Sequence, residues 1–348
     1  MLELADLRKA YDGFAFGPVD LAVDEEVLAV LGPSGSGKTT LLSLVAGLTE
    51  PDGGTVALGE RSLVGRPLEA RGVGLVFQDG ALFPHMTARE NVAYATDDDE
   101  RVRELAERLE IADVLDRRPA ALSGGERRRV ALARTLAADP DALLLDEPLT
   151  SLDTPVRRRL RDELADLFAD LSVPVVYVTH DQRAATALGD RVAVLRAGSV
   201  EQVGTPEDVL RRPATPFVAR FTGSENVFEA TVVATEGDGV ALRVGDLTLE
   251  AAADTPVGAT VRACLRPSRL RVVGPDAPDC GPNVVRGTVR RRTNEGDDYR
   301  LVVAVDNADF DLVASVRPGR FDGGSVAAGD DLWLSIPPDR LHLIEDGQ

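Results

Sequence analysis

Apolar and polar positions follow one pattern up to about Phe221 and another after it. In residues 1–221, short apolar runs alternate with longer stretches in which apolar residues recur at helical spacing. The short runs indicate buried strands, and the longer period indicates amphipathic helices. From residue 222 onward the segments are short, alternate apolar with polar residues and are separated by glycine. The pattern therefore predicts an α/β domain over residues 1–221 and an all-β domain over residues 222–348.

Three segments of the first part illustrate the assignments. Residues 2–7 alternate apolar and polar side chains, as an edge strand does. The continuous apolar run at 142–145 is typical of a strand covered on both faces. Residues 97–111 carry one apolar stripe, which predicts a helix. The other expected strands are 19–23, 27–31, 55–58, 72–77, 173–178 and the hairpin 192–195 with 200–203. The other expected helices are 40–46, 127–138, 157–170 and a last one that starts at Pro206, with Thr205 as its N-cap.

The second part lacks any long helical pattern. Its short alternating segments, each bounded by turn residues, are typical of small β-barrels or of a β-sandwich. The expected strands are residues 227–233, 240–244, 247–249, 261–265, 284–289, 300–305, 309–313 and 332–336.

Composition narrows the functional classes. Asp and Glu number 58 against 39 Lys and Arg, which gives a net charge of −19. Such acidity disfavours nucleic-acid binding, which needs basic surfaces. It fits a strongly hydrated, salt-tolerant surface, and a halophilic source is our hypothesis. A disordered acidic chain is excluded because 44% of the residues are hydrophobic and follow globular patterns.

Targeting and redox signals are sparse. We expect neither a signal peptide nor a membrane span, because no apolar run approaches roughly 20 residues. Cys264 and Cys280 either form a disulfide or remain two thiols in a reducing compartment, and we favour the thiols.

The clearest motif is Gly32-Pro33-Ser34-Gly35-Ser36-Gly37-Lys38-Thr39, which has the form G-x-x-x-x-G-K-[ST] and stands between an expected strand and an expected helix. Glycines let backbone N–H groups converge on phosphate oxygens, and the helix N-terminus adds a positive potential. Lys38 would reach the β- and γ-phosphates, and Thr39 would hold Mg²⁺. The chain has lysine only at Lys9 and Lys38. Its retention at Lys38 suits a site that needs a compact point charge rather than a planar guanidinium.

Four further features follow in order: Gln78 at the end of a buried strand, Leu122-Ser123-Gly124-Gly125-Glu126, the pair Asp146-Glu147, and His180 at another strand end. Ser123 and Glu126 also form a capping-box pattern. Together with the phosphate loop, these motifs resemble those of the ATP-binding-cassette (ABC) ATPases over residues 1–221. The resemblance implies an α/β P-loop NTPase with a RecA-like core and a helical subdomain at about residues 80–140.

The resemblance implies a role for each matching residue in binding ATP and Mg²⁺. Tyr11 would stack on adenine, Asp146 would bind Mg²⁺ through water, and Gln78 would reach Mg²⁺ and the attacking water. Glu147 would polarise that water, and His180 would contact the γ-phosphate. The residues implied to cradle the phosphates are Gly32, Pro33, Ser34, Gly35, Ser36, Gly37, Lys38, Thr39 and Thr40.

In this family, the signature residues Ser123, Gly124, Gly125 and Glu126 serve the ATP bound to another subunit, and Asp153 would line the seam between the two. One chain carries one copy of each motif. The implied working unit is therefore a head-to-tail pair with two ATP molecules between its members.

Segments of the β part resemble the transport-associated oligonucleotide-fold (OB) domains of import ATPases. They are Thr222 to Phe228, Asn283 to Val289, Cys264 to Leu270 and Ile336 to Ile344. The resemblance implies permease partners, indirect contact with an external solute-binding protein, and a peripheral place at the cytoplasmic face of the membrane. We expect an oxyanion such as molybdate or tungstate as the solute, with polyamine, ferric iron, sulfate or sugar as alternatives.

Other classes remain in view. Cassette ATPases of DNA repair or of ribosomes, which would want a coiled-coil insertion, paired cassettes or a basic face, are distant alternatives, and an exporter is another. The run Arg290-Arg291-Arg292 is either an anion site or a solvated stretch of strand.

Overall fold

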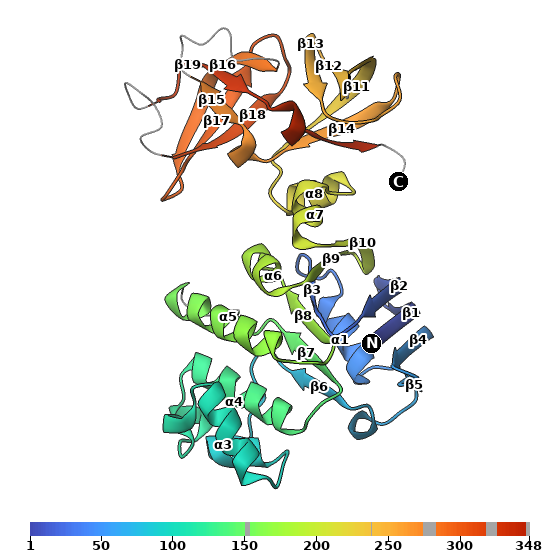
Figure 1. Cartoon of the computed structure of the whole chain (residues 1–348), viewed down its shortest axis with the longest axis vertical. Coiled ribbons are helices and arrows are strands. Elements are labelled where there is room, and N and C mark those ends of the chain that lie inside the picture. The colour runs from blue at the N-terminus through green and yellow to red at the C-terminus, as the bar shows by residue number, and fades with distance from the viewer. Residues whose placement is uncertain (150–153, 238, 274–282, 318–325, 346–348) are drawn as a thin grey trace. The chain divides into compact units, whose positions relative to one another are not determined.

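The computed structural model describes residues 1–149, 154–237, 239–273, 283–317 and 326–345 (Figure 1). The chain divides into two compact units, Met1–Pro206 and Glu207–Gln348, and each is considered by itself. Within the described residues, no helix combines the length and the apolar character that crossing a membrane requires.

The larger sheet of the first unit runs in the order β10-β9-β3-β8-β7-β6. Its strands are β3 (Val27–Leu31), β6 (Val73–Val76), β7 (Ala142–Asp146), β8 (Val175–Thr179), β9 (Arg191–Arg196) and β10 (Ser199–Gly204). Strands β3, β6, β7, β8 and β9 pair in parallel, and β10 closes the sheet as an antiparallel hairpin with β9. In the register, Leu31 lies beside Thr179, Asp146 beside Val178, and Val76 beside Leu145. Strands β3, β6, β7 and β8 therefore end at one common edge.

A second, antiparallel sheet has the order β2-β1-β4-β5. Its strands are β1 (Leu2–Tyr11), β2 (Phe14–Val23), β4 (Gly53–Leu58) and β5 (Arg61–Ser62). The expectation of an edge strand at residues 2–7 is wrong, because β1 pairs with β2 on one side and with β4 on the other. The alternation arises because Leu2, Leu4 and Leu7 face the core while their neighbours are less buried. Alternation indicates one covered face and does not indicate an unpaired edge.

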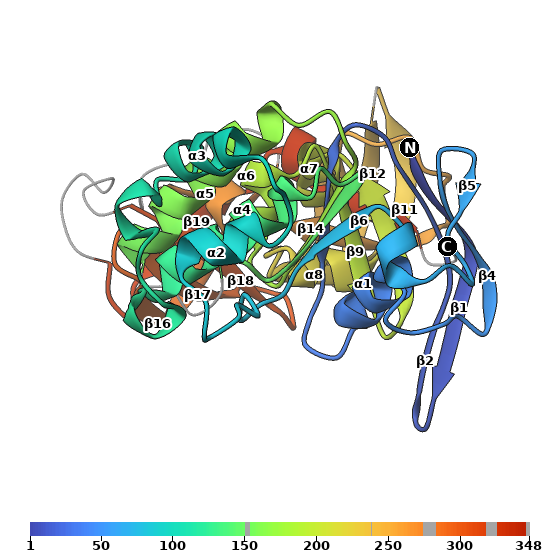
Figure 2. The ribbon, with the colours of Figure 1, turned by 90° about the horizontal axis from the view of Figure 1, so that it is seen from below.

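The helices of the first unit are α1 (Lys38–Ala46), α2 (Ala88–Ala93), α3 (Asp99–Arg108), α4 (Gly124–Ala137), α5 (Thr154–Ala169) and α6 (Gln182–Leu188). Helix α1 packs into the core that both sheets share. Helices α2, α3 and α4 pack on one another and lie on the opposite side of the larger sheet from β1, β2 and β4 (Figures 1 and 2). This group occupies the region of the expected helical subdomain. Short 3₁₀ turns occur at Leu68–Ala70, Ala112–Val114 and Pro119–Ala121.

The second unit is built mainly from two antiparallel sheets, with the orders β13-β12-β11-β14-β20 and β15-β19-β16-β17-β18. Buried residues of both sheets form one core, as expected of an all-β domain. The strands are β11 (Asn226–Glu236), β12 (Gly239–Val244), β13 (Leu247–Ala251), β14 (Thr260–Leu265), β15 (Arg271–Val273), β16 (Val284–Asn294), β17 (Tyr299–Val305), β18 (Asp311–Val316), β19 (Asp331–Ser335) and β20 (His342–Glu345). The remaining elements are α7 (Pro206–Arg211), α8 (Pro216–Phe221) and the 3₁₀ turns Pro267–Arg269 and Pro338–Arg340.

The change to all-β structure comes after α8 at Phe221, whereas the compact units divide after Pro206. Helix α8 packs with the β sheets because Ala219 forms a small buried cluster with Cys264 and Ile344. Cys264 is a buried free thiol, and Cys280 lies outside the described residues. The domain division at residue 221 remains a prediction.

Candidate phosphate and carboxylate site

The phosphate loop connects β3 directly to α1, which begins at Lys38. Gly37 precedes the helix with a φ of 104°. A Cβ at Gly37 would lie 2.9 Å from the ring of Phe16 and 3.2 Å from that of Phe14, so a side chain is excluded by space and by conformation. The N–H group of Gly198, in the β9–β10 turn, donates to the carbonyl oxygen of Ser36 at 2.8 Å. The loop is thus held from both sides by backbone and aromatic contacts.

Three features of the loop suit a bound phosphate. The Oγ of Ser36 is buried and has no hydrogen-bond partner among the described residues. The ammonium of Lys38 is almost fully buried and donates to the carbonyl oxygens of Gly32 at 2.8 Å and Pro33 at 3.0 Å. The first turn of α1 carries no acidic residue, so the positive end of the helix is uncompensated. The loop therefore supplies donors and positive charge that an anion would satisfy.

Two carboxylates stand at the end of β7, next to the loop. Burial, followed by the charge of Glu147, raises the pKa of Asp146, while Lys38 opposes the shift. Burial lowers the pKa of Lys38, and Glu147 and Asp146 oppose that shift. Lys38, at the start of α1, and the two carboxylates, at the end of β7, are therefore close enough for each charge to act on the others. A divalent cation with oxygen ligands suits such a group.

Glu147 occupies an unusual backbone position. Its φ is 47°, and its N–H group donates to the carbonyl oxygen of Val178 at 3.1 Å. Its Oε2 lies 2.6 Å from Nδ1 of His180, and its side chain is 14% exposed against 55% for His180. Adjacent strand residues point to opposite faces, so the turn at Glu147 is what lets it accompany Asp146. Strained backbone of this kind is concentrated at functional sites.

Two other expected residues lie near strand ends. Gln78 is exposed two residues beyond β6, and its carbonyl oxygen accepts a hydrogen bond from Nε of Arg128 at 3.4 Å. Tyr11 ends β1, is 44% exposed, and its ring lies 6.3 Å from that of Phe14 at an interplanar angle of 29°. Since Phe14 also approaches Gly37, an aromatic pair borders the phosphate loop. Sequence analysis missed Phe14, although its place just after the Asp12-Gly13 turn was a usable signal.

The signature residues occupy the start of α4. Ser123 accepts a hydrogen bond from the N–H group of Glu126 at 3.2 Å, and the Glu126 carboxylate accepts one from the N–H group of Ser123 at 2.5 Å. The predicted capping box is thus present, with Gly124 and Gly125 as the first helical residues. Within the described residues, no hydrogen bond or ion pair joins this turn to the phosphate loop. Asp153 lies outside the described residues.

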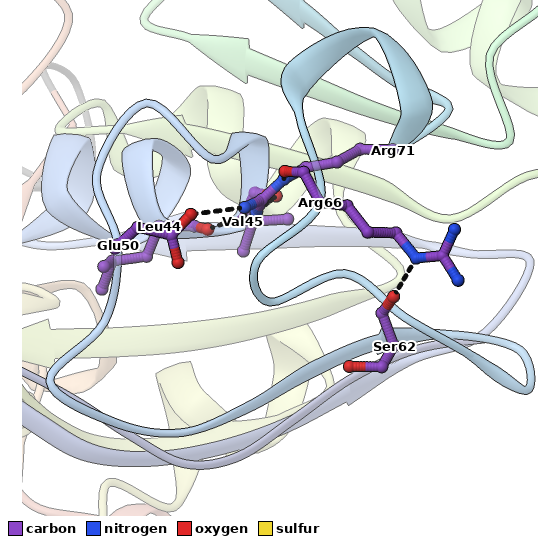
Figure 3. A network of polar contacts seen from close by, with 6 residues as sticks. All are labelled: Leu44, Val45, Glu50, Ser62, Arg66 and Arg71. Atoms are coloured by element: carbon purple, nitrogen blue, oxygen red, sulfur yellow. Dashed lines mark hydrogen bonds and ion pairs between the residues drawn. The ribbon is translucent and has the colours of Figure 1, made fainter.

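A buried guanidinium at the other end of α1 was not foreseen. Arg71 has no exposed surface, and its Nη1 donates to the carbonyl oxygens of Leu44 and Val45, each at 3.2 Å (Figure 3). Its Nε donates to the carbonyl oxygen of Arg66 at 3.1 Å, and its Nη2 lies 3.3 Å from Oε1 of Glu50. Arg71 therefore completes the last turn of the helix whose first turn follows the phosphate loop.

Comparison with known proteins agrees with this geometry. Residues 18–150 match the family model described as ABC transporter, and residues 263–344 match the model described as TOBE domain. The spermidine/putrescine import ATP-binding protein PotA of Marinobacter nauticus is 41% identical over 322 residues, which cover 88% of this chain and 85% of that protein. The sn-glycerol-3-phosphate import ATP-binding protein UgpC of Cereibacter sphaeroides is 41% identical over 287 residues, which cover 80% and 81% respectively.

A solved structure gives the same result for the first part. The dimeric, post-hydrolysis state of the ATP-binding cassette MJ0796 bound to ADP and Pi superposes with a TM-score of 0.53 at 30% identity, covering 59% of this chain and 99% of that one. The chain therefore belongs to the ABC transporter family. It is an import-type ABC ATPase with a C-terminal TOBE domain, and its cofactors are ATP and Mg²⁺. The expected fold class and enzyme class are confirmed.

Proposed function

We propose that this chain hydrolyses ATP to drive uptake of a small solute through separate permease subunits, at the cytoplasmic face of the cell membrane. An external binding protein would deliver the solute to the permease. The observation that carries the proposal is the contact of 2.6 Å between Nδ1 of His180 and Oε2 of Glu147, at the sheet edge where the charges of Glu147 and Asp146 act on Lys38. The import proteins among its relatives support the transport role.

Each residue then has a task that its position allows. Lys38 and the N–H groups of the loop would bind the β- and γ-phosphates. The Glu147 carboxylate would orient the attacking water and accept its proton, and His180 would fix that carboxylate and face the γ-phosphate. Thr39, Gln78 and Asp146 would hold Mg²⁺, which when bound neutralises phosphate charge. The pair of Tyr11 and Phe14 would stack on adenine.

We propose further that the site is completed by a second copy of the chain. The turn of Ser123, Gly124, Gly125 and Glu126 presents a helix N-terminus, which is an anion site. Among the residues that the structure describes, it forms no hydrogen bond or ion pair with its own phosphate loop. Two chains arranged head to tail would each place this turn on the partner's ATP. The dimeric cassettes among the solved relatives support the arrangement.

The solute is better proposed as a polyamine than as an oxyanion. The relatives named above import spermidine and putrescine or sn-glycerol 3-phosphate, and this favours the alternative over molybdate or tungstate. Seven relatives matched at 37–41% identity carry the polyamine name across more than four-fifths of both chains. A sugar-phosphate or polyol-phosphate solute is the second candidate. The halophilic source remains a prediction.

The substitution Glu147→Gln tests both the proposed ATP hydrolysis and the proposed solute uptake. It keeps the side chain's size and removes its capacity to accept a proton, so we expect ATP turnover to fall about a hundredfold or more while ATP binding persists. In cells lacking the native copy, wild type should restore uptake of labelled spermidine and the variant should not. Normal turnover by the variant contradicts the role of Glu147. If the wild type restores uptake of glycerol 3-phosphate and not of spermidine, the proposal of a polyamine solute is wrong and glycerol 3-phosphate takes its place.

A further inference from the structure

The segment between β6 and α2 carries Gln78 and makes a strained turn directly after it. Gly80 and Ala81 have φ angles of 78° and 41°. Alanine rarely adopts a positive φ, so such a turn persists only where the surrounding structure holds it. Within the segment, the N–H group of Gly80 donates to the carbonyl oxygen of Phe77 at 2.9 Å, and that of Ala81 donates to Oδ1 of Asp79 at 3.1 Å. The position of Gln78 therefore depends on how this turn is held from outside.

Helix α4 supplies the outside contact. Nη2 of Arg134 donates to the carbonyl oxygen of Gly80 at 3.2 Å, and the guanidinium lies 5.2 Å from the centroid of the Phe83 ring. A Cβ at Gly80 would lie 3.4 Å from that of Ala131, which stands one turn before Arg134 on the same face of α4. The strained turn thus packs on α4, and Arg134 bonds it there.

Arg134 has no carboxylate partner among the residues that the structure describes. Its side chain is half-buried, and this burial lowers its pKa. Partial burial of a charge without an opposite charge lowers stability, so packing alone does not account for an arginine at this place. What the guanidinium adds is a fixed contact with the turn that follows Gln78.

The far end of the segment is fixed separately. Asn91 of α2 has no exposed surface, and its Oδ1 accepts a hydrogen bond from the N–H group of Phe83 at 2.9 Å. Its Nδ2 donates to the carbonyl oxygens of Phe83 at 3.2 Å and Thr87 at 2.9 Å. A buried amide whose partners are all backbone groups of one loop holds that loop in one conformation. With residues 83–87 fixed in this way, the contacts with α4 decide where the Gln78 end lies.

From these contacts we infer that Arg134 is a positioning residue for Gln78: it holds the turn at Gly80 against α4 and so sets where the Gln78 side chain stands at the Mg²⁺ site. The inference rests on the proposed role of Gln78 as a ligand of Mg²⁺. Arg128 also contacts the segment, but its hydrogen bond to the carbonyl oxygen of Gln78 is longer, at 3.4 Å, and therefore weaker.

Equilibrium binding of Mn²⁺, used in place of Mg²⁺, tests the inference without turnover. The Glu147→Gln protein is loaded with one ATP per chain, and free Mn²⁺ is measured by electron paramagnetic resonance during the titration. We expect Arg134→Met in this background to weaken Mn²⁺ binding about tenfold, because a ligand of the ion loses its support. ATP binding in EDTA should be the same in both proteins, since Arg134 does not touch the phosphate loop in the described residues.

Two variants serve as controls for Arg134→Met. Arg134→Lys keeps a donor and a positive charge over the Phe83 ring, so it should hold Mn²⁺ within about threefold of its parent. Arg103→Met removes an arginine that is exposed on α3 and pairs with Glu100 of the same helix at 2.6 Å. It should bind Mn²⁺ as its parent does.

Gln78→Ala shows whether Arg134 acts through Gln78. Alone it should also weaken Mn²⁺ binding about tenfold, and the addition of Arg134→Met should then change little, because both substitutions remove the same ligand. Additive losses would overturn the inference, as would parental Mn²⁺ affinity in Arg134→Met or in Gln78→Ala. A loss of ATP binding in EDTA by Arg134→Met that equals its loss of Mn²⁺ binding would make Arg134 merely structural.

A failure of the proposed function would look different. If the wild type does not hydrolyse ATP with Mg²⁺, the proposed function is wrong, yet the Mn²⁺ titrations still decide the role of Arg134. In an active protein, we expect Arg134→Met to lower kcat about tenfold and to leave the KM for ATP unchanged.

Discussion

Arg71 shows how a single side chain outside the chemistry can fix the phosphate loop. Its guanidinium donates to carbonyl oxygens at the C-terminal end of α1, where a positive charge also complements the helix dipole. Space for it exists because residue 47 is glycine: a Cβ there would lie 2.2 Å from Cζ of Arg71. The helix is thereby anchored at one end by Arg71 and at the other by the loop around Ser36 and Lys38.

Replacement of Arg71 should therefore be costly. In Arg71→Met the buried carbonyl oxygens lose their donor, and we expect the free energy of unfolding to fall by about 3 kcal/mol, with weaker ATP binding. The stability of Arg71→Lys should lie between that of the wild type and that of Arg71→Met, because an ammonium cannot reach all of the carbonyl oxygens at once. Urea denaturation followed by circular dichroism measures the loss of stability, and titration with a fluorescent ATP analogue measures the loss of ATP binding.

Arg66→Met is the matched control for Arg71→Met. Arg66 is exposed, and only its backbone oxygen serves Arg71, so its side chain can be removed without touching the buried network. Equal stability losses in the two variants would contradict the anchoring role of Arg71. Sequence analysis named Lys38, Glu147 and His180 as site candidates because fixed motifs contain them, and the structure places them near strand ends or at the start of α1. It missed Arg71 because an arginine in a connecting segment is normally exposed, and its burial depends on Gly47 and α1.

At the scale of elements, the second unit contains a strand pairing that the sequence concealed. Strand β20 pairs with β14, and Nε2 of His342, its first residue, lies 3.1 Å from the carbonyl oxygen of Pro213, between α7 and α8. Burial lowers the pKa of His342, the hydrogen bond to Pro213 opposes this shift, and the charge of Arg212 adds to it. The folded state therefore favours the neutral imidazole.

This contact gives the second unit a pH dependence. An unfolded histidine takes up a proton near pH 6.5, whereas folded His342 does so only at lower pH. Stability should therefore decline as the pH falls through about 6.5, by no more than about 1.4 kcal/mol per pH unit from this group. His342→Gln keeps a donor for Pro213 and should flatten this part of the profile.

The measurement can be confined to the second unit. Trp333 in β19 is the only tryptophan of the chain, so its fluorescence during urea unfolding between pH 7 and pH 5 follows that unit. His85→Gln is the control, because His85 is exposed in the first unit. An identical pH profile for wild type and His342→Gln would exclude His342 as the source.

Most elements could be predicted where an apolar pattern began or ended at a turn or at a helix cap. The buried runs at β3, β7 and β8, the capping box of α4 and the β9–β10 hairpin all met that condition. Strands β15 and β20 were missed, since they are short and carry a polar or charged first residue. Their pairing with β19 and β14 comes from tertiary contacts that no local pattern encodes.

At the scale of the whole molecule, the proposed ATP site needs a second chain. Ser123 caps the N-terminus of α4 and is exposed, while Lys38, Asp146 and Glu147 lie at the sheet edge. A site divided in this way makes ATP the link between two copies, because each nucleotide would contact the loop of one chain and the signature turn of the other. Whether the two copies can close on ATP would then depend on the shape and charge of the signature turn.

Ser123→Arg tests this directly. A bulky side chain at the turn should block closure, so ATP turnover should fall about tenfold or more, while the phosphate loop of the same chain still binds ATP. Ser123→Ala is the control for the cap itself, which contributes about 1 kcal/mol to the helix; it should retain more turnover than the arginine variant. Light scattering in the Glu147→Gln background, with ATP, should show a dimer that the added Ser123→Arg abolishes. If that double variant still dimerises with ATP, the signature turn does not lie at the nucleotide of the partner, and the shared site is wrong.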